Sequence, residues 1–124
     1  MSHRDLLENP IPVTLATVGP TSPPQLTAVW VMLDDDLIIT SLARVRQKLK
    51  NLEVQPPATV FVIDPSNPIK TLEVRCDVTI TPDPDLEVLK RLLTVYGTAL
   101  ASFQAPLEAR IAVELRPIHV VAIG

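Results

Sequence analysis

One segment of this chain alternates apolar and polar residues without interruption. Its apolar members are Leu72, Val74, Cys76, Val78 and Ile80, and its polar members are Glu73, Arg75, Asp77 and Thr79. A period of two over nine residues predicts a β-strand that buries one face and leaves the other in water. Because an isolated strand cannot bury a face, the chain must supply neighbouring strands and a common core.

Five further segments have the composition of strands and are bounded by turn-forming residues. They are residues 13–18, 25–33, 37–40, 58–63 and 110–123, the last one interrupted or bulged near Pro117. Asp34 and Asp35 form a tight turn that makes a hairpin of the second and third segments. Prolines, thirteen in all, mark most of the breaks in the pattern.

Two or three short helices are expected between these strands. Residues 2–9 form a short helix or helical turn. Residues 44–54 follow Ser41, a natural N-cap, and form a helix with one apolar stripe. Asp83 or Asp85 begins another helix, which gathers four residues near one face: Leu86, Leu89, Leu93 and Tyr96.

The second and fourth strands are apolar on both faces, whereas one small antiparallel sheet usually has a wet face. Two-sided burial suggests a closed barrel with a cover, supplied by a helix or by another subunit. We therefore expect a mainly β protein: one domain over residues 1–124, built as a six-stranded antiparallel barrel that forms a homodimer.

The bulk composition excludes several classes of protein. A chain of 124 residues with 47% hydrophobic residues is a folded single domain. A net charge of -3 argues against nucleic-acid binding, and the sequence has no apolar run of membrane-spanning length. A lone cysteine, Cys76, forms no internal disulfide, which fits a reducing cytoplasm. We interpret Cys76 as a small buried hydrophobic residue. Three glycines leave no room for a glycine-rich phosphate loop, and there is no metal-binding motif.

Four cations, Arg44, Arg46, Lys48 and Lys50, fall within seven residues directly after the third strand. Taken alone, such a cluster is more often a solvated face of a helix. The second interpretation is a phosphate site, since a helix start offers free N–H groups and the dipole attracts anions.

Several segments, in this order, resemble the split-barrel flavoproteins of the pyridoxamine-phosphate-oxidase-like family. The opening Val-Thr-Leu-Ala-Thr-Val of residues 13–18 is similar to the family's first strand, and Thr-Ala-Val-Trp of residues 27–30 to its second. Residues 41–52 are similar to the pattern Ser-x-x-x-x-Arg-x-Lys-x-x-Asn-Leu. Within the family the chain looks most like the small flavin- or deazaflavin-dependent oxidoreductases.

The resemblance implies a cofactor, FMN or F420, between which these residues do not decide. It gives Arg46 and Lys48 the role of phosphate partners. The other residues it implies are the hydroxyl donors Thr40 and Ser41, the weaker candidates Arg44 and Asn51, and Val29, Trp30 and Val31 beside the ring system. The second subunit would form the other wall of the site.

The function implied is hydride transfer between this cofactor and a small organic substrate, and no catalytic side chain is assigned. The alternative is a non-catalytic module that carries a flavin or haem on the same fold. A nucleic-acid or protein adaptor that uses the basic helix is the weakest candidate. For Trp30, packing in the core or at a dimer interface is at least as favoured as cofactor contact.

Overall fold

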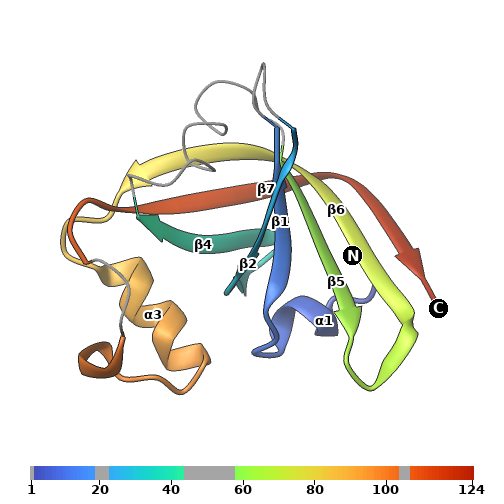
Figure 1. Ribbon diagram of the computed structural model, residues 1–124, viewed down its shortest axis with the longest axis horizontal. Coiled ribbons are helices and arrows are strands. Elements are labelled where there is room, and N and C mark those ends of the chain that lie inside the picture. The colour runs from blue at the N-terminus through green and yellow to red at the C-terminus, as the bar shows by residue number, and fades with distance from the viewer. Residues whose placement is uncertain (1, 19–22, 44–57, 104–106) are drawn as a thin grey trace.

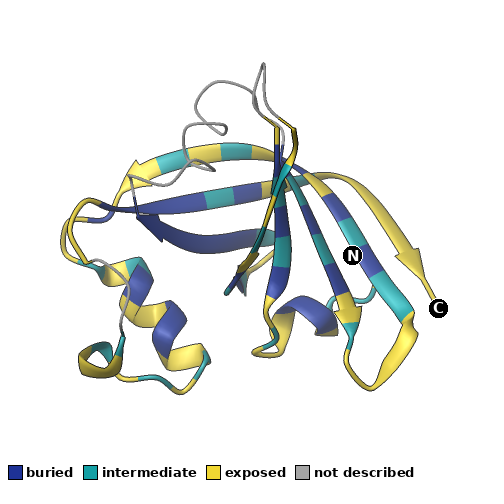
Figure 2. Cartoon of the chain, in the orientation of Figure 1, coloured by how far each residue is buried: buried dark blue, intermediate teal, exposed yellow. Residues whose placement is uncertain are grey.

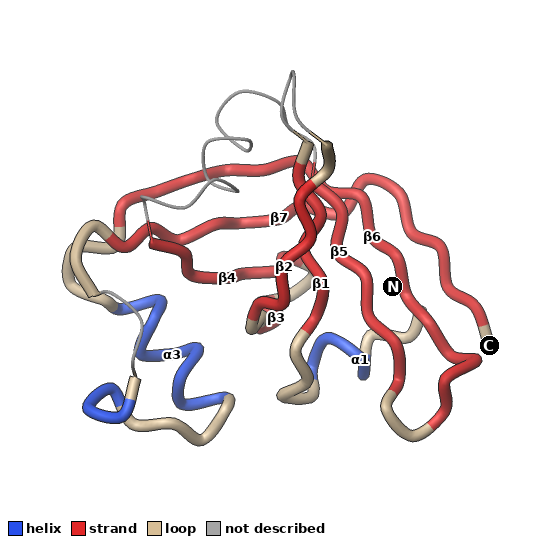
Figure 3. Tube along the Cα trace, viewed as in Figure 1, coloured by secondary structure: helices blue, strands red, loops and turns tan. Residues whose placement is uncertain are grey.

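The computed structural model describes residues 2–18, 23–43, 58–103 and 107–124. Within them, seven strands form one antiparallel sheet in the order β2-β1-β5-β6-β7-β4-β3 (Figures 1 and 3). The strands are β1 Val13–Thr17, β2 Gln25–Val29, β3 Met32–Asp34, β4 Leu37–Ala43, β5 Ala58–Asp64, β6 Asn67–Pro82 and β7 Arg110–Ile123. The described helices are α1 Asp5–Glu8, α3 Glu87–Val95 and the 3-10 turn η1 Leu100–Ser102.

The sheet curls into a half-barrel because its two edge strands are neighbours in the sequence. β2 and β3 lie at opposite ends of the strand order, yet only Trp30 and Val31 separate them along the chain. The long strands β6 and β7 form the curved wall that runs across Figure 1. The expectation of a mainly β, antiparallel fold is confirmed. The expected strand over residues 25–33 is two strands, so the count is seven in the described residues, not six.

The break at Trp30 and Val31 is held by side chains that replace ladder hydrogen bonds. The hydroxyl of Thr40 donates to the carbonyl of Trp30 at 2.7 Å. The phenol oxygen of Tyr96 accepts the N–H of Val31 at 3.2 Å and donates to the carbonyl of Ile11 at 3.0 Å. The Tyr96 ring also stacks on Trp30, with centroids 4.4 Å apart and planes 7° from parallel. These contacts satisfy backbone groups that an uninterrupted strand would have paired.

The predicted alternation of residues 72–80 is confirmed in β6. Leu72, Val74 and Cys76 are buried, and the polar residues between them face outward or are half-buried. β6 pairs with β7 along almost its whole length, with one shift: Arg75 lies opposite His119, and Cys76 lies opposite Pro117. The extra residue on β7 is therefore Ile118, which confirms the predicted bulge near Pro117.

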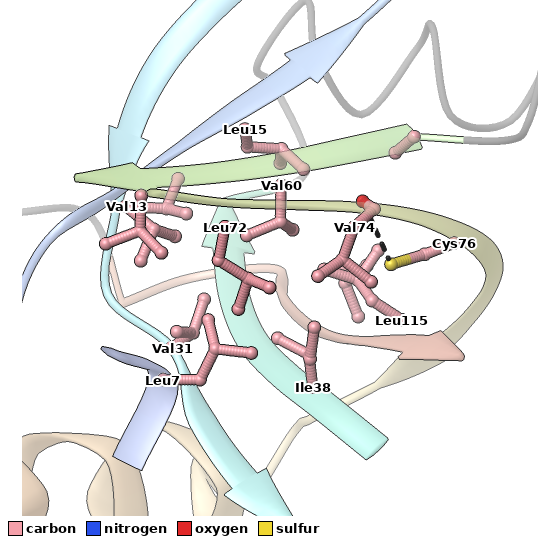
Figure 4. Close-up of a cluster of buried hydrophobic side chains, with 14 of the residues drawn as sticks. Leu7, Val13, Leu15, Val31, Ile38, Val60, Leu72, Val74, Cys76 and Leu115 are labelled. Carbon is pink, nitrogen blue, oxygen red and sulfur yellow. Dashed lines mark hydrogen bonds between the residues drawn. The ribbon is translucent and has the colours of Figure 1, made fainter. Parts of the chain in front are cut away.

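The core lies inside the curl of the sheet, where buried aliphatic side chains of β1, β4, β5, β6 and β7 meet (Figures 2 and 4). Helix α1, which confirms the expected helical turn in residues 2–9, adds Leu6 and Leu7 to this core. Exposed ion pairs flank the helix, Arg4 with Asp36 at 2.6 Å and Lys70 with Asp5 at 2.7 Å. The Lys70 hydrogen bond also lowers the pKa of the Asp5 carboxyl.

Helix α3 covers the outer face of the β3–β4 hairpin. Leu92 packs there with Met32 and Ile39 in a second apolar cluster. The carboxylate of Asp83 accepts the backbone N–H groups of Val88 at 3.3 Å and Leu89 at 3.1 Å. Helix α3 begins at Glu87, with Leu86 at its N-cap position, so the expected start at Asp83 or Asp85 is two to four residues too early. The Asp83 carboxylate nevertheless supplies negative charge where the helix dipole favours it.

Two expectations are wrong, and a third is not tested. Ser41 is not an N-cap, because β4 continues to Ala43 and Ser41 pairs with Ala112. The helix expected at residues 44–54 lies outside the described residues. Two-sided burial of the second segment is not found within this chain, since β2 is an edge strand and Leu26 is 69% exposed.

No helix in the described part of the chain is long and apolar enough to cross a membrane.

Tyr96→Phe tests the joint between β2 and β3. The substitution keeps the ring stack but leaves the Val31 N–H and the Ile11 carbonyl without their partner. We expect a loss of about 1–3 kcal/mol in the free energy of unfolding, measured by urea denaturation. Thr94→Val is the matched control, because it removes an exposed hydroxyl of the same helix, and it should change stability by less than about 0.5 kcal/mol. Equal effects of the two variants would contradict this account of the joint.

The burial of Cys76 can be tested through the reactivity of its thiol and through the pH dependence of stability. Burial raises the pKa of the Cys76 thiol to about 12, and neighbouring Asp77 contributes. The native thiol should therefore resist Ellman's reagent at pH 8 and react after unfolding. Above about pH 9 the unfolded thiol loses its proton while the folded thiol keeps it, so stability falls by up to about 1.4 kcal/mol per pH unit. Cys76→Ala should lose less stability than the wild type between pH 9 and 10; an identical pH slope would be evidence against a buried thiol.

Candidate functional site

A pocket of about 180 Å³ lies between the ends of β2 and β4 and the facing side of α3. In Figure 1 this is the region where α3 faces β4. Most of the described residues around the pocket are apolar, and two are polar. They are Ala28, Val29, Trp30, Ser41, Leu42, Ala43, Leu89, Leu92, Phe103 and Arg110.

Ser41 and Arg110 form the polar wall of the pocket, and strand register brings them together. Arg110 lies opposite Ala43 in the β4–β7 ladder, so its side chain shares a face with Ala43 and with Ser41 two residues earlier. The guanidinium donates to the Ser41 hydroxyl oxygen from Nη2 at 2.9 Å and from Nε at 3.2 Å. Arg110 is only 6% exposed and Ser41 only 8%. A positive charge is thus held in a largely buried wall.

Phe103 fixes the guanidinium from a second direction. It follows η1, and its ring centroid is 5.3 Å from the central carbon of the Arg110 guanidinium. At that distance the ring face attracts the cation. Leu89 and Leu92 of α3 and Trp30 from the β2–β3 joint complete the walls. Among the described residues, the pocket therefore pairs an apolar surface with a localised cation and a hydroxyl.

Only some of the site residues predicted from the sequence lie at the pocket. Val29, Trp30 and Ser41 line the pocket. Thr40 is buried and its hydroxyl is engaged by the Trp30 carbonyl, while Val31 is buried in the barrel core. The remaining four predicted residues lie outside the described residues: Arg44, Arg46, Lys48 and Asn51.

Trp30 packs against its neighbours, as one of the two predictions from the sequence has it, and its contact with a cofactor stays a prediction. It is half-buried, stacks on Tyr96 and packs beside the second apolar cluster, and it also lines the pocket. Burial raises the pKa of the Tyr96 phenol, so this group keeps its proton through the neutral range and goes on donating to Ile11. The aromatic wall of the pocket is therefore anchored by a neutral phenol that makes two hydrogen bonds.

Sequence reasoning missed Arg110 and Phe103 as site residues. Arg110 begins the closing strand, and nothing in its local pattern separates it from an exposed strand-end cation. The signal that would have found it is the antiparallel register, which places it across from the end of β4. Phe103 lies in a segment without periodicity, and only its contact with Arg110 marks it.

Comparison with solved structures shows what this chain is similar to. A structure described as an F420 reductase is 33% identical, with a TM-score of 0.87, over 98% of this chain and 97% of the other. A conserved hypothetical protein from Mycobacterium tuberculosis is 21% identical, with a TM-score of 0.76, over 99% and 84% of the two chains. The General Stress Protein 26 from Bacillus anthracis is 15% identical, with a TM-score of 0.72, over 96% and 88%. The last two share the fold.

No protein of curated function matches the sequence at a significant level. A family model, by contrast, covers nearly the whole chain: the model described as pyridoxamine 5'-phosphate oxidase matches residues 2–123. The curled antiparallel sheet, the motifs in their order and this match agree. The chain belongs to the pyridoxamine 5'-phosphate oxidase family.

Proposed function

We propose that this protein is an oxidoreductase that binds F420 or FMN and transfers a hydride between that cofactor and a small organic substrate. The observation that carries the proposal is the 33% identity to an F420 reductase over almost the full length of both chains. That likeness favours F420 over FMN as the cofactor to test first.

The residues of the pocket fit such a cofactor in kind. A flavin or deazaflavin has a flat ring system edged with carbonyl oxygens and an anionic tail. The aliphatic walls from Leu89 and Leu92 and the indole of Trp30 suit a flat ring, and Ser41 with Arg110 suits electron-rich oxygens. Arg46 and Lys48, in the segment that continues the chain from the pocket residue Ala43, are proposed to bind the phosphate.

The protein's part in the reaction is to bind, orient and exclude water. When bound, the cofactor supplies the hydride chemistry. The Trp30–Tyr96 stack and the guanidinium beside Phe103 fix two walls at defined positions. Fixed walls lower the entropy cost of aligning a substrate with the ring. No side chain is required to act as a general base in this scheme.

We also propose that the protein is a homodimer, as the family resemblance implied. β4 pairs with β7 only up to Leu115, so among the described strands β6 alone accompanies the rest of β7. Ile118 and Ile123 on this portion are each 55% exposed. An open strand edge with exposed apolar side chains favours pairing with another chain, and a second copy is the partner proposed.

Titration with F420 and with FMN tests cofactor binding, followed by the fluorescence of each cofactor. We expect saturable binding of at least one, weakened about tenfold or more in Lys48→Ala, since a hydrogen bond to a charged group is lost. Lys90→Ala, which removes an exposed cation of α3, is the matched control and should leave affinity unchanged. If neither cofactor binds, the proposal fails.

A turnover assay distinguishes the proposed oxidoreductase from a non-catalytic module that carries a flavin or haem. Chemically reduced F420 bound to the protein should be reoxidised by at least one member of a panel of small organic acceptors, faster than free reduced F420. A tightly bound cofactor that no acceptor reoxidises would instead support the non-catalytic module.

Sedimentation velocity tests the dimer. The wild type should sediment as a dimer, and Ile118→Lys should shift it to a monomer by placing a charge on the proposed apolar edge. Thr79→Lys adds the same charge on the polar face of β6 and should stay dimeric. A monomeric wild type at micromolar concentration would rule out this assembly.

A further inference from the structure

We infer that Tyr96 is a positioning residue for the ring of the ligand, although it is not among the described residues that line the pocket. By stacking on Trp30, Tyr96 sets the plane of the indole against which a flat ring would pack. The inference rests on the proposed function for the kind of ligand, a flavin-like ring. It goes further because it names a residue outside the pocket that determines how well that ring binds.

Trp30 is held both at its backbone and at its ring. The peptide group that follows it is bound at both polar atoms: the Thr40 hydroxyl donates to the Trp30 carbonyl at 2.7 Å, and the Val31 N–H donates to the Tyr96 phenol oxygen at 3.2 Å. The Tyr96 ring lies on the indole, with centroids 4.4 Å apart and planes 7° from parallel. An indole has only two side-chain torsions, so a fixed backbone and a fixed ring plane leave it little freedom.

Tyr96 also belongs to the element that forms another wall of the pocket. It ends α3, where its N–H donates to the Leu92 carbonyl at 3.2 Å, and Leu89 and Leu92 of the same helix line the pocket. The phenol ties this end of the helix to the carbonyl of Ile11, at 3.0 Å. One helix therefore supplies one wall itself and holds Trp30 through Tyr96, so the spacing of the two walls is set before a ligand arrives.

Only part of the indole is left for a ligand. Tyr96 covers one face of Trp30, so the surface that lines the pocket is the opposite face or the edge of the ring. Aromatic rings pack in offset parallel layers or edge to face, and both arrangements depend on the plane of the partner. A ring that enters the pocket meets a partner of fixed orientation, and less free energy is lost in ordering the wall. Loosening the indole should therefore weaken ring binding although the ligand loses no direct contact.

Riboflavin, which has the flavin ring without the phosphate, tests this role. Its fluorescence and that of Trp30, the chain's only tryptophan, both report stacking. We expect saturable quenching in the wild type, an affinity about threefold weaker in Tyr96→Phe, which keeps the stack, and about tenfold weaker or more in Tyr96→Leu, which loses it. Thr94→Val, an exposed change on the same helix, should match the wild type. No binding of riboflavin by the wild type, or equal affinity in all variants, would overturn the inference.

A second measurement separates positioning from general damage to the site. FMN is riboflavin with a phosphate, so the ratio of the two affinities measures the contribution of the phosphate. Tyr96→Leu should weaken both ligands by the same factor and leave the ratio unchanged, whereas Lys48→Ala should lower it. Circular dichroism at low temperature confirms that each variant is folded. A ratio that falls as far in Tyr96→Leu as in Lys48→Ala would refute the positioning role.

The two proposals fail in different ways. If neither F420 nor FMN binds more tightly than riboflavin, and no acceptor is reduced, the proposed function fails, while graded riboflavin affinities would still support the role of Tyr96. If a cofactor binds and turns over but Tyr96→Leu binds riboflavin as the wild type does, the positioning role fails and the proposed function stands.

Discussion

The hydrogen bonds of the Tyr96 phenol are the interaction on which the rest of the architecture depends. One oxygen accepts from Val31 and donates to Ile11, and the ring below it stacks on Trp30. Through these contacts the end of α3 holds the short link between β2 and β3, the two edges of the sheet. A flat sheet of the same strands would expose its inner aliphatic face to water. The same Tyr96 contacts therefore hold both the curl of the sheet and the position of α3.

The pocket results from the way α3 is held across the sheet. Because α3 is held at its far end by Tyr96 and at its start by Asp83, it bridges the outer face of β4 and leaves a space beside the strand ends. Strand register then brings Arg110 to Ser41 in this space. The apolar walls come from packing, while the polar wall comes from pairing between β4 and β7. Family membership and the likeness to an F420 reductase are the reasons for proposing a flavin or deazaflavin as the ligand of this pocket.

The elements that could be predicted from the sequence are those whose signal is local. The alternation of β6, the proline-marked bulge in β7 and the acidic start of α3 all follow from residues within one segment. The break at Trp30 could not be predicted, because tryptophan and valine are both good strand formers, and the groups that hold the break, Thr40 and Tyr96, lie 10 and 65 residues away. Likewise Ser41 was found through a motif, whereas Arg110 needed the register of two strands 69 residues apart.

The first helix has a consequence for the order of folding. His3 reaches the carbonyl of Ile123, a contact that spans 120 positions of the chain, and Leu6 and Leu7 are buried in a core to which β7 contributes. A growing polypeptide cannot complete these contacts until its final strand has left the ribosome. Contacts so distant in sequence carry a large loop-closure cost and form slowly. Helix α1 packs against β3 and β5, so its two leucines find part of their core early. The completion of that core and the His3 contact both wait for the final strand.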